Sequence, residues 1–119
     1  VVVVAVAAYN TTEGHTDFHP QAREDCGYVL TIDNDLRIYI AGDTEPTPEM
    51  LALENIDIAF LPVNQPYTMT VDQAVEAVKA IRPCVFYPYH YGEVEEKTDI
   101  ERLQSELADV CEVRVFPME

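Results

Sequence analysis

Short apolar stretches separated by polar segments recur along the chain, and their spacing predicts strands alternating with helices. Several stretches are rich in Val, Ile, Leu, Phe and Tyr, a composition typical of strands. We predict strands at residues 1–8, 27–32, 36–41, 56–63, 84–88 and 111–116. The β-branched first run indicates a buried strand, because it lacks a basic flank and is too short to span a bilayer.

Three helices are predicted between these strands. Thr47 suits the N-cap of the first helix, with Pro48 at its first position. Capping-box patterns at residues 70–73 and 98–101 begin the other two, and Pro83 ends the second. One face of the second helix is apolar and consists of Val71, Ala74, Val75, Val78 and Ile81.

Two connections are informative. Residues 33–35 (DND) suit a tight turn and predict a hairpin between the second and third strands. Residues 9–26 form an 18-residue polar stretch without periodicity that holds two of the three histidines. Structureless connections of this length are usually functional.

The order of elements predicts the fold class. Strands that alternate with helices indicate an α/β fold, layered as in α+β proteins, with a mixed sheet whose helical crossovers cover at least one face. With no repeat, linker or internal boundary, we predict one domain over residues 1–119.

Charge and cysteine content narrow the partners and the compartment. The chain has 22 acidic and 7 basic residues, a net charge of −15, which disfavours nucleic acid and anionic membranes as partners. The cysteines, Cys26, Cys84 and Cys111, form no CxxC pair, so we predict buried thiols in a reducing, cytoplasmic compartment.

The candidate chemistry lies where predicted strands end. His15 and His19 are in the long loop, Asp43 follows the third strand, and His90 follows the fifth. Histidine and carboxylate without cysteine favour zinc, iron or manganese. On pattern alone, Asp43 could equally cap a turn, and His90 could be a core histidine bonded to a backbone carbonyl.

Several motifs, in order, resemble metallo-β-lactamase-fold hydrolases, in particular a lactonase-like and largely uncharacterised branch. Residues 41–44 (AGDT) resemble the turn after that family's β-hairpin. Residues 56–63 with 67–69 (IDIAFLPV and YTM), and residues 74–83 with 88–92 (AVEAVKAIRP and PYHYG), resemble segments of this branch. The resemblance covers nearly the whole chain and identifies it with the C-terminal half of the αββα sandwich, with helices on one face of its sheet.

The resemblance implies a metal-dependent hydrolase that acts on a small-molecule substrate. In the family two metal ions, typically zinc, with manganese or iron as other options, lie between two sheets, and a bridging water attacks an ester, lactone or phosphodiester bond. Asp43 would be the bridging carboxylate, because its two oxygens can reach two cations, and His90 the last histidine ligand. Asp43 and His90 are therefore the expected catalytic residues.

The remaining ligand of this half is a histidine upstream of the hairpin. His19, in residues 18–20 (FHP), matches the branch, and residues 8–10 (AYN) agree with it. His15, in residues 14–16 (GHT), resembles a motif of other branches. We predict His19 as the third metal ligand and keep His15 as the alternative.

One departure from the family limits the prediction. The family's His-x-His-x-Asp-His run, which supplies about half of the ligands, does not occur in the sequence, and we expect it upstream of Val1. Three ligands spread over two metals leave too many open positions for tight binding by this chain alone. The alternatives are a non-catalytic half-domain that self-associates as a homo-oligomer, and a mononuclear metal binder that uses all three ligands.

Overall fold

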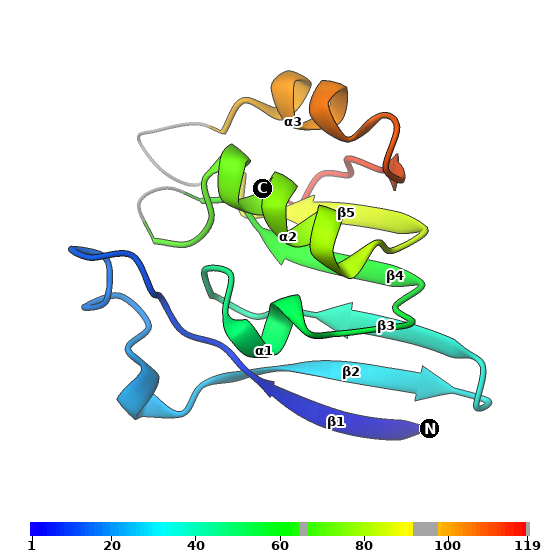
Figure 1. Cartoon of the computed structure of the whole chain (residues 1–119), viewed down its shortest axis with the longest axis horizontal. Coiled ribbons are helices and arrows are strands. Elements are labelled where there is room, and N and C mark those ends of the chain that lie inside the picture. The colour runs from blue at the N-terminus through cyan, green and yellow to red at the C-terminus, as the bar shows by residue number, and fades with distance from the viewer. Residues whose placement is uncertain (65–66, 92–97, 119) are drawn as a thin grey trace.

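A single mixed sheet organises the structure, a computed structural model that describes residues 1–64, 67–91 and 98–118. The spatial order of its strands follows the chain: β1 (Val2–Ala7), β2 (Cys26–Ile32), β3 (Leu36–Ile40), β4 (Ile58–Pro62), β5 (Val85–Tyr89) and β6 (Glu112–Val113). The first three strands pair antiparallel and the last four pair parallel (Figure 1). The predicted mixed sheet is confirmed.

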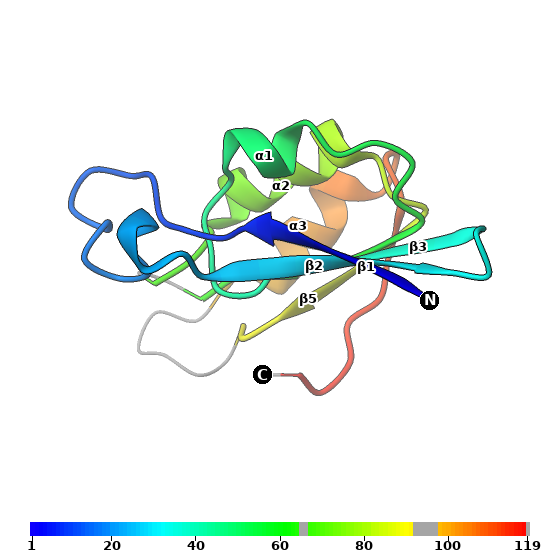
Figure 2. The same ribbon diagram turned by 90° about the horizontal axis from the view of Figure 1, so that it is seen from below.

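The α-helices lie on the same face of the sheet, as predicted. They are α1 (Pro48–Leu51), α2 (Val71–Ile81) and α3 (Ile100–Leu107), and the view along the sheet shows all three on one side (Figure 2). The long loop contains a short 3₁₀ helix, η1 (Gln21–Arg23). No helix in the described part of the chain is long and apolar enough to cross a bilayer.

Residues that can be recognised in the sequence determine where α2 begins and ends. The Thr70 hydroxyl accepts a hydrogen bond from the Gln73 amide at 3.0 Å, and the Thr70 amide donates to the Gln73 side chain at 2.9 Å. This capping box satisfies amides that have no partner within the helix. The helix ends where Arg82 turns left-handed, with φ of 52°, directly before Pro83.

The cap of α3 differs from the prediction by one residue. Asp99, rather than Thr98, is the N-cap, and its carboxylate accepts from the Arg102 amide at 3.0 Å. The Thr98 hydroxyl instead donates to the carbonyl of Val63 at the end of β4. Thr98 therefore joins the helix to the sheet.

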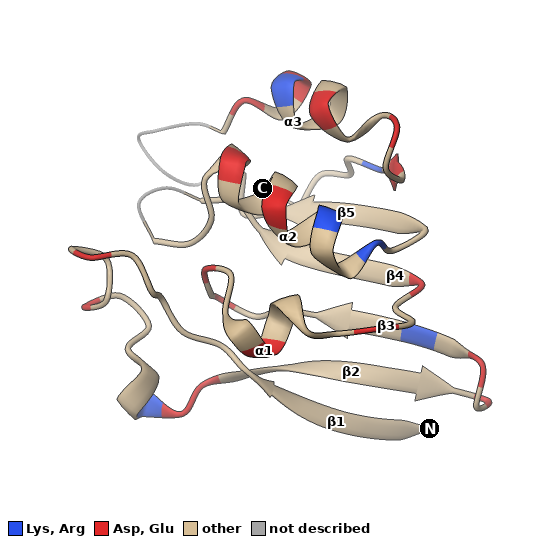
Figure 3. Ribbon diagram, in the orientation of Figure 1, with Lys and Arg blue, Asp and Glu red and all other residues tan. Residues whose placement is uncertain are grey.

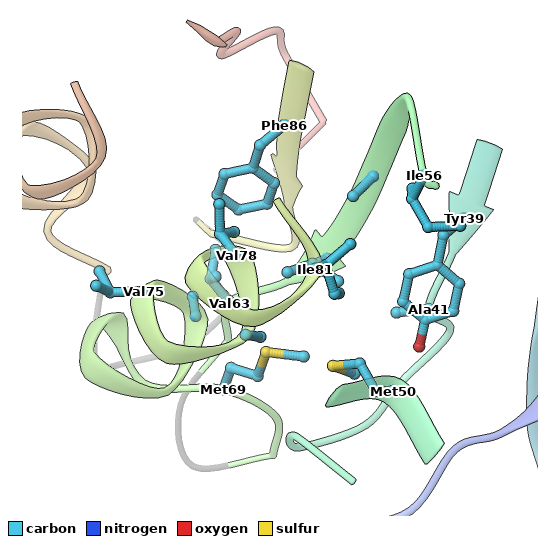
Figure 4. Packing of buried hydrophobic residues seen from close by; sticks show 14 of the residues in the cluster. Tyr39, Ala41, Met50, Ile56, Val63, Met69, Val75, Val78, Ile81 and Phe86 are labelled. Carbon is cyan, nitrogen blue, oxygen red and sulfur yellow. The ribbon is translucent and has the colours of Figure 1, made fainter. Parts of the chain in front are cut away.

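The hydrophobic core fills the space between the sheet and the helices. One cross-sheet row that points toward the helices is fully buried and consists of Val29, Tyr39, Ala59 and Phe86. Figure 4 shows Tyr39 and Phe86 pointing from the sheet into this layer, where Met50 and Met69 also lie. The apolar face predicted for α2 is buried against the row.

The opposite face of the sheet is apolar, and none of the described helices lies on it. Its central row runs across four strands and consists of Tyr28, Ile40, Phe60 and Tyr87. The Phe60 and Tyr87 rings stack 4.8 Å apart, and Tyr28 and Ile40 are exposed. Charged residues gather on helices, turns and loops, and the strands carry few (Figure 3). We call the sheet face that carries the row of Tyr28, Ile40, Phe60 and Tyr87 the open face.

Three predictions, two about the outer strands and one about the cysteines, are wrong. β1 is an edge strand, so Val2, Val3 and Val4 are more than half exposed instead of buried. β6 is only two residues long, because pairing with β5 ends at Val113. The cysteines are unpaired but not buried: Cys84 is exposed, and the other two are half-buried.

Candidate metal centre

Asp43 lies in a tight turn at the carboxyl end of β3. Gly42 before it has a left-handed backbone, with φ of 75°. At Gly27 of the neighbouring strand, a Cβ atom would lie 2.3 Å from the carbonyl oxygen of Ala41, so only glycine lets β2 approach the turn this closely. The turn leaves the Asp43 carboxylate 44% exposed.

His90 follows β5 directly and is held by backbone contacts. The carboxyl ends of β3, β4 and β5 lie on the same side of the molecule, on the left in Figure 1. The backbone of His90 is left-handed, with φ of 61°, and its amide donates to the carbonyl of Met118 at 2.8 Å. The parallel pairing of β3, β4 and β5 therefore places His90 beside the Asp43 turn.

His19 reaches the same place from the long loop. Its backbone is also left-handed, with φ of 55°, and its carbonyl accepts a hydrogen bond from the Asn10 amide at 3.0 Å. This contact brings the loop back to its starting point at the end of β1. The His19 side chain is 19% exposed, the least exposed of the three predicted ligands.

The structure brings the three predicted ligands together around Asp43. The Nε2 atom of His19 lies 4.0 Å from Oδ2 of Asp43, and Nε2 of His90 lies 3.5 Å from Oδ1. Both separations exceed a hydrogen bond. The His90 separation is close to the value of about 3.4 Å expected for two ligand atoms each about 2.1 Å from one tetrahedral zinc ion, and the His19 separation is longer. Each carboxylate oxygen thus faces a different histidine, an arrangement that fits one metal ion on each side of Asp43.

His15, the alternative ligand, lies elsewhere. Its Nδ1 atom is 3.8 Å from Oε2 of Glu45, a buried carboxylate two residues beyond Asp43. The described residues also offer no group of three or more His, Cys, Asp or Glu side chains able to hold one ion. The structure therefore places His15 beside Glu45, and it places His19 and His90 beside Asp43.

The two sides of Asp43 open onto different surfaces. A pocket of about 410 Å³ beside His19 and Asp43 is polar, with Arg23, Asp25, Cys26 and Tyr28 among its lining. A second hollow of about 360 Å³ beside His90 is lined mainly by Ile40, Phe60, Tyr89 and Met118 and continues the apolar open face. A ligand between the histidines would meet charged groups on one side and apolar groups on the other.

The sequence interpretation missed a tyrosine that links the two ends of the site. The Tyr89 hydroxyl donates to the carbonyl of Gly42 at 2.6 Å, and its ring lies 5.0 Å from the His90 ring. Burial, and then the charge of Asp43, raise the pKa of this phenol, so Tyr89 stays a donor. No pattern indicated this contact, because its residues lie 47 positions apart.

Fold and site together identify the class of protein. The model for the beta-lactamase superfamily domain matches residues 1–91, and the chain belongs to this family. A metallo-beta-lactamase fold protein from Bacillus subtilis has a similar fold, with 13% identity and a TM-score of 0.66 over 98% of this chain and 46% of that one.

Closer relatives carry a functional description. The chain is 34% identical to a metal-dependent hydrolase of Koribacter versatilis over 94% of this chain and 48% of that protein. It is 40% identical to one from Thermoplasma acidophilum, over 76% of this chain and 42% of that protein. A solved structure from Parabacteroides distasonis, described as a proposed metal-dependent hydrolase, is 52% identical with a TM-score of 0.87, over 98% of this chain and 51% of that one. The chain therefore spans about half the length of these relatives.

Proposed function

We propose that this chain supplies one half of a binuclear metal hydrolase site, with Asp43 bridging two ions and one histidine on each. The observation that carries the proposal is the position of Asp43, whose two oxygens face His19 and His90 separately. The relatives named as metal-dependent hydrolases support a metal-dependent reaction. Zinc suits the histidine and carboxylate donors best, and manganese or iron would also accept them.

Each residue has a distinct role in this proposal. Asp43 would supply negative charge to bound cations, and His19 and His90 would each supply an imidazole nitrogen, because each faces its own carboxylate oxygen. Tyr89 fixes the Gly42 carbonyl and thereby the turn from which Asp43 projects. Bound metal would lower the pKa of a coordinated water so that hydroxide is available near neutral pH.

The bond we propose to be cleaved is an ester, lactone or phosphodiester. Attack by hydroxide on such a bond creates negative charge, and Arg23 in the polar pocket is a cation close to where that charge would develop. The apolar hollow beside His90 suits a hydrocarbon portion of the substrate.

The open face supports a proposal about partners. Its row of Tyr28, Ile40, Phe60 and Tyr87 is apolar, and no described helix covers it. Among the described residues, Arg114 and Phe116 of the C-terminal segment lie against Tyr87 at one end of the row, and Tyr28 and Ile40 at the other end are exposed. Because the chain spans about half of its relatives, we propose that the other half of such a protein covers this face and completes the ligand set. A second copy of the chain is the alternative cover, and sedimentation velocity would distinguish a dimer from a monomer.

Zinc titration of the full chain by calorimetry tests the site. We expect weak binding that Asp43→Ala reduces by at least about a hundredfold, because the substitution removes a ligand from both ions, whereas an outer contact is worth roughly tenfold to a hundredfold. Asp25→Ala is the matched control, since Asp25 lines the same pocket and is paired with Arg23 at 2.6 Å. Equal losses in both variants would show that general negative charge, and not this site, attracts the metal.

A further inference from the structure

Glu45, two residues beyond Asp43, is a buried carboxylate that is not among the site residues predicted from the sequence. Its side chain is 1% exposed. Its Oε1 atom accepts from the amides of Thr11 and Thr12 at 2.8 and 2.7 Å. Its Oε2 atom accepts from the Thr12 hydroxyl at 2.5 Å and from the Gln73 side chain at 2.8 Å. All of its partners lie at the start of the long loop or on α2.

These contacts satisfy both oxygens of the carboxylate. Each oxygen accepts two hydrogen bonds, and the donors are the amides of Thr11 and Thr12, the Thr12 hydroxyl and the Gln73 side chain. Hydrogen bonds to an ionised acceptor are roughly twice as strong as neutral ones. Glu45 is therefore a strong anchor for the backbone of residues 11 and 12.

Thr44 adds a second attachment to the same segment. Its hydroxyl accepts from the Tyr9 amide at 2.9 Å, and the Glu45 amide donates to the Tyr9 carbonyl at 3.3 Å. Both Thr44 and Glu45 are buried. The chain directly after Asp43 is thus joined to the start of the loop over residues 9–12.

Asn10 carries this attachment across to His19. Its amide donates to the His19 carbonyl at 3.0 Å, so the residue between the Thr44 and Glu45 contacts also holds the histidine. The contacts form a closed ring: the chain runs from Asp43 to Glu45, Glu45 binds Thr12, and Asn10 binds His19. The ring closes where His19 faces Asp43 at 4.0 Å.

We propose that Glu45 is a positioning residue that sets the place of His19 relative to Asp43 and leaves His90 unaffected. Glu45 does this through the backbone of the loop, since the hydrogen bonds to its carboxylate come from Thr11, Thr12 and Gln73 and not from His19. The consequence for metal binding rests on the proposed function, whereas the positioning itself does not. Glu45 would act on one of the two histidine ligands only.

The three histidines of the chain give a direct test. In imidazole-labelled, metal-free protein, Glu45→Gln should shift or broaden the His19 resonances and leave those of His90 in place. The amide of Asn10 should lose hydrogen-exchange protection by roughly tenfold or more, because the ring that holds it has lost a charged acceptor. His15 contacts Glu45 and will shift in any case, so His19 and Asn10 are the informative reporters.

Glu49→Gln is the matched control. Glu49 lies in α1 and accepts a hydrogen bond from the Tyr9 hydroxyl at 2.9 Å, so it makes the same type of change next to the same segment without touching the loop backbone. We expect His19 and the Asn10 amide to be unchanged in this variant. Equal behaviour of the two variants, or an equal shift of His90 in Glu45→Gln, would overturn the proposal.

A second variant and a zinc titration keep the test decisive if Glu45→Gln folds poorly. Thr12→Val removes one hydroxyl donor to Glu45 at an exposed residue, so it should reproduce a smaller His19 shift even if Glu45→Gln folds poorly. A zinc titration should then show that Glu45→Gln weakens the response of His19 by roughly tenfold while the midpoint for His90 stays constant. If wild-type histidines ignore zinc but Glu45→Gln still displaces His19, the metal proposal fails and the positioning role stands.

Discussion

The two sides of Asp43 are built in different ways. On the His90 side, the ligand follows a central strand, and register with β4 and a backbone contact to Met118 fix it. On the His19 side, the ligand lies in an 18-residue loop held by polar side chains, Asn10, Thr44 and Glu45. One histidine inherits its place from the sheet, and the other depends on a few hydrogen bonds between residues distant in sequence.

This difference separates two ways of damaging one site. Sheet hydrogen bonds are shared among many residues, so a single side chain contributes little to the place of His90. The loop has few apolar contacts, and its order rests on buried polar groups whose loss leaves donors or acceptors unpaired. We therefore expect substitutions on the His19 side to have larger and more local effects.

The largest effect is expected from Asn10, which is 3% exposed. Its side chain donates to the carbonyls of His15 and Tyr67 at 3.1 and 2.7 Å. Asn10→Ala removes both hydrogen bonds and should cost about 2 kcal/mol of unfolding free energy, although the His15 carbonyl still accepts from the Phe18 amide. Urea denaturation measures this loss, and faster tryptic cleavage after Arg23 reports opening of the loop.

Asn10→Asp tests the cause of that loss. It preserves the shape of the side chain but replaces the amide donor with acceptors that face two carbonyls. It should be at least as damaging as Asn10→Ala. A stable Asn10→Asp variant, or faster cleavage after Lys79 in α2 as well as after Arg23, would contradict a local role for this residue.

A smaller effect is expected from Tyr89 on the other side. Tyr89→Phe removes the hydrogen bond to the Gly42 carbonyl and should cost about 1 kcal/mol, or a factor of roughly five to ten in zinc affinity. Tyr87→Phe is the control, because it removes a hydroxyl two residues earlier that accepts from Arg114 at 3.0 Å. His90 resonances should move in the first variant alone, and movement of His19 instead would break the distinction between the two sides.

The smallest effect is expected from pH. Because the pKa of Glu45 is lowered in the folded chain, its contribution is complete above the ordinary value of 4.5 and is lost as pH falls through the lowered pKa. Protection factors of the Thr11 and Thr12 amides should stay constant from neutral pH to about 5 and then decline. The decline should be absent in Glu45→Gln, and an unchanged profile in that variant would assign it to another group.

Local features of the fold were predictable from the sequence. The capping box of Thr70 and Gln73 and the buried face of α2 follow from spacing within a few residues, and the structure confirms them. The hairpin follows from residues 33–35, where Asp33 and Asn34 adopt the left-handed backbone that their short polar side chains tolerate. Resemblance indicated Asp43 and His90, whose role as ligands stays a prediction.

Long-range contacts were not predictable in the same way. In the sequence, nothing distinguishes Glu45 from an acidic residue on the surface. Only the folded chain shows that Thr11, Thr12 and Gln73 surround it. Exposure also depends on the position of a strand in the sheet, which the composition of the valine-rich β1 does not reveal. The one-residue error at Asp99 arose because the Thr98 hydroxyl donates to the carbonyl of Val63, directly after β4, and Asp99 caps the helix instead.

The left-handed backbones of His19 and His90 lower the stability of the folded chain at the two residues that the site needs. A non-glycine residue in this conformation costs roughly 1 kcal/mol or more, and the protein carries that cost at both predicted ligands. Glycine at either position would relieve the strain and abolish the ligand. A screen of this chain for thermal stability alone would therefore tend to recover variants that have lost their histidines, so such a screen needs a parallel selection for metal binding.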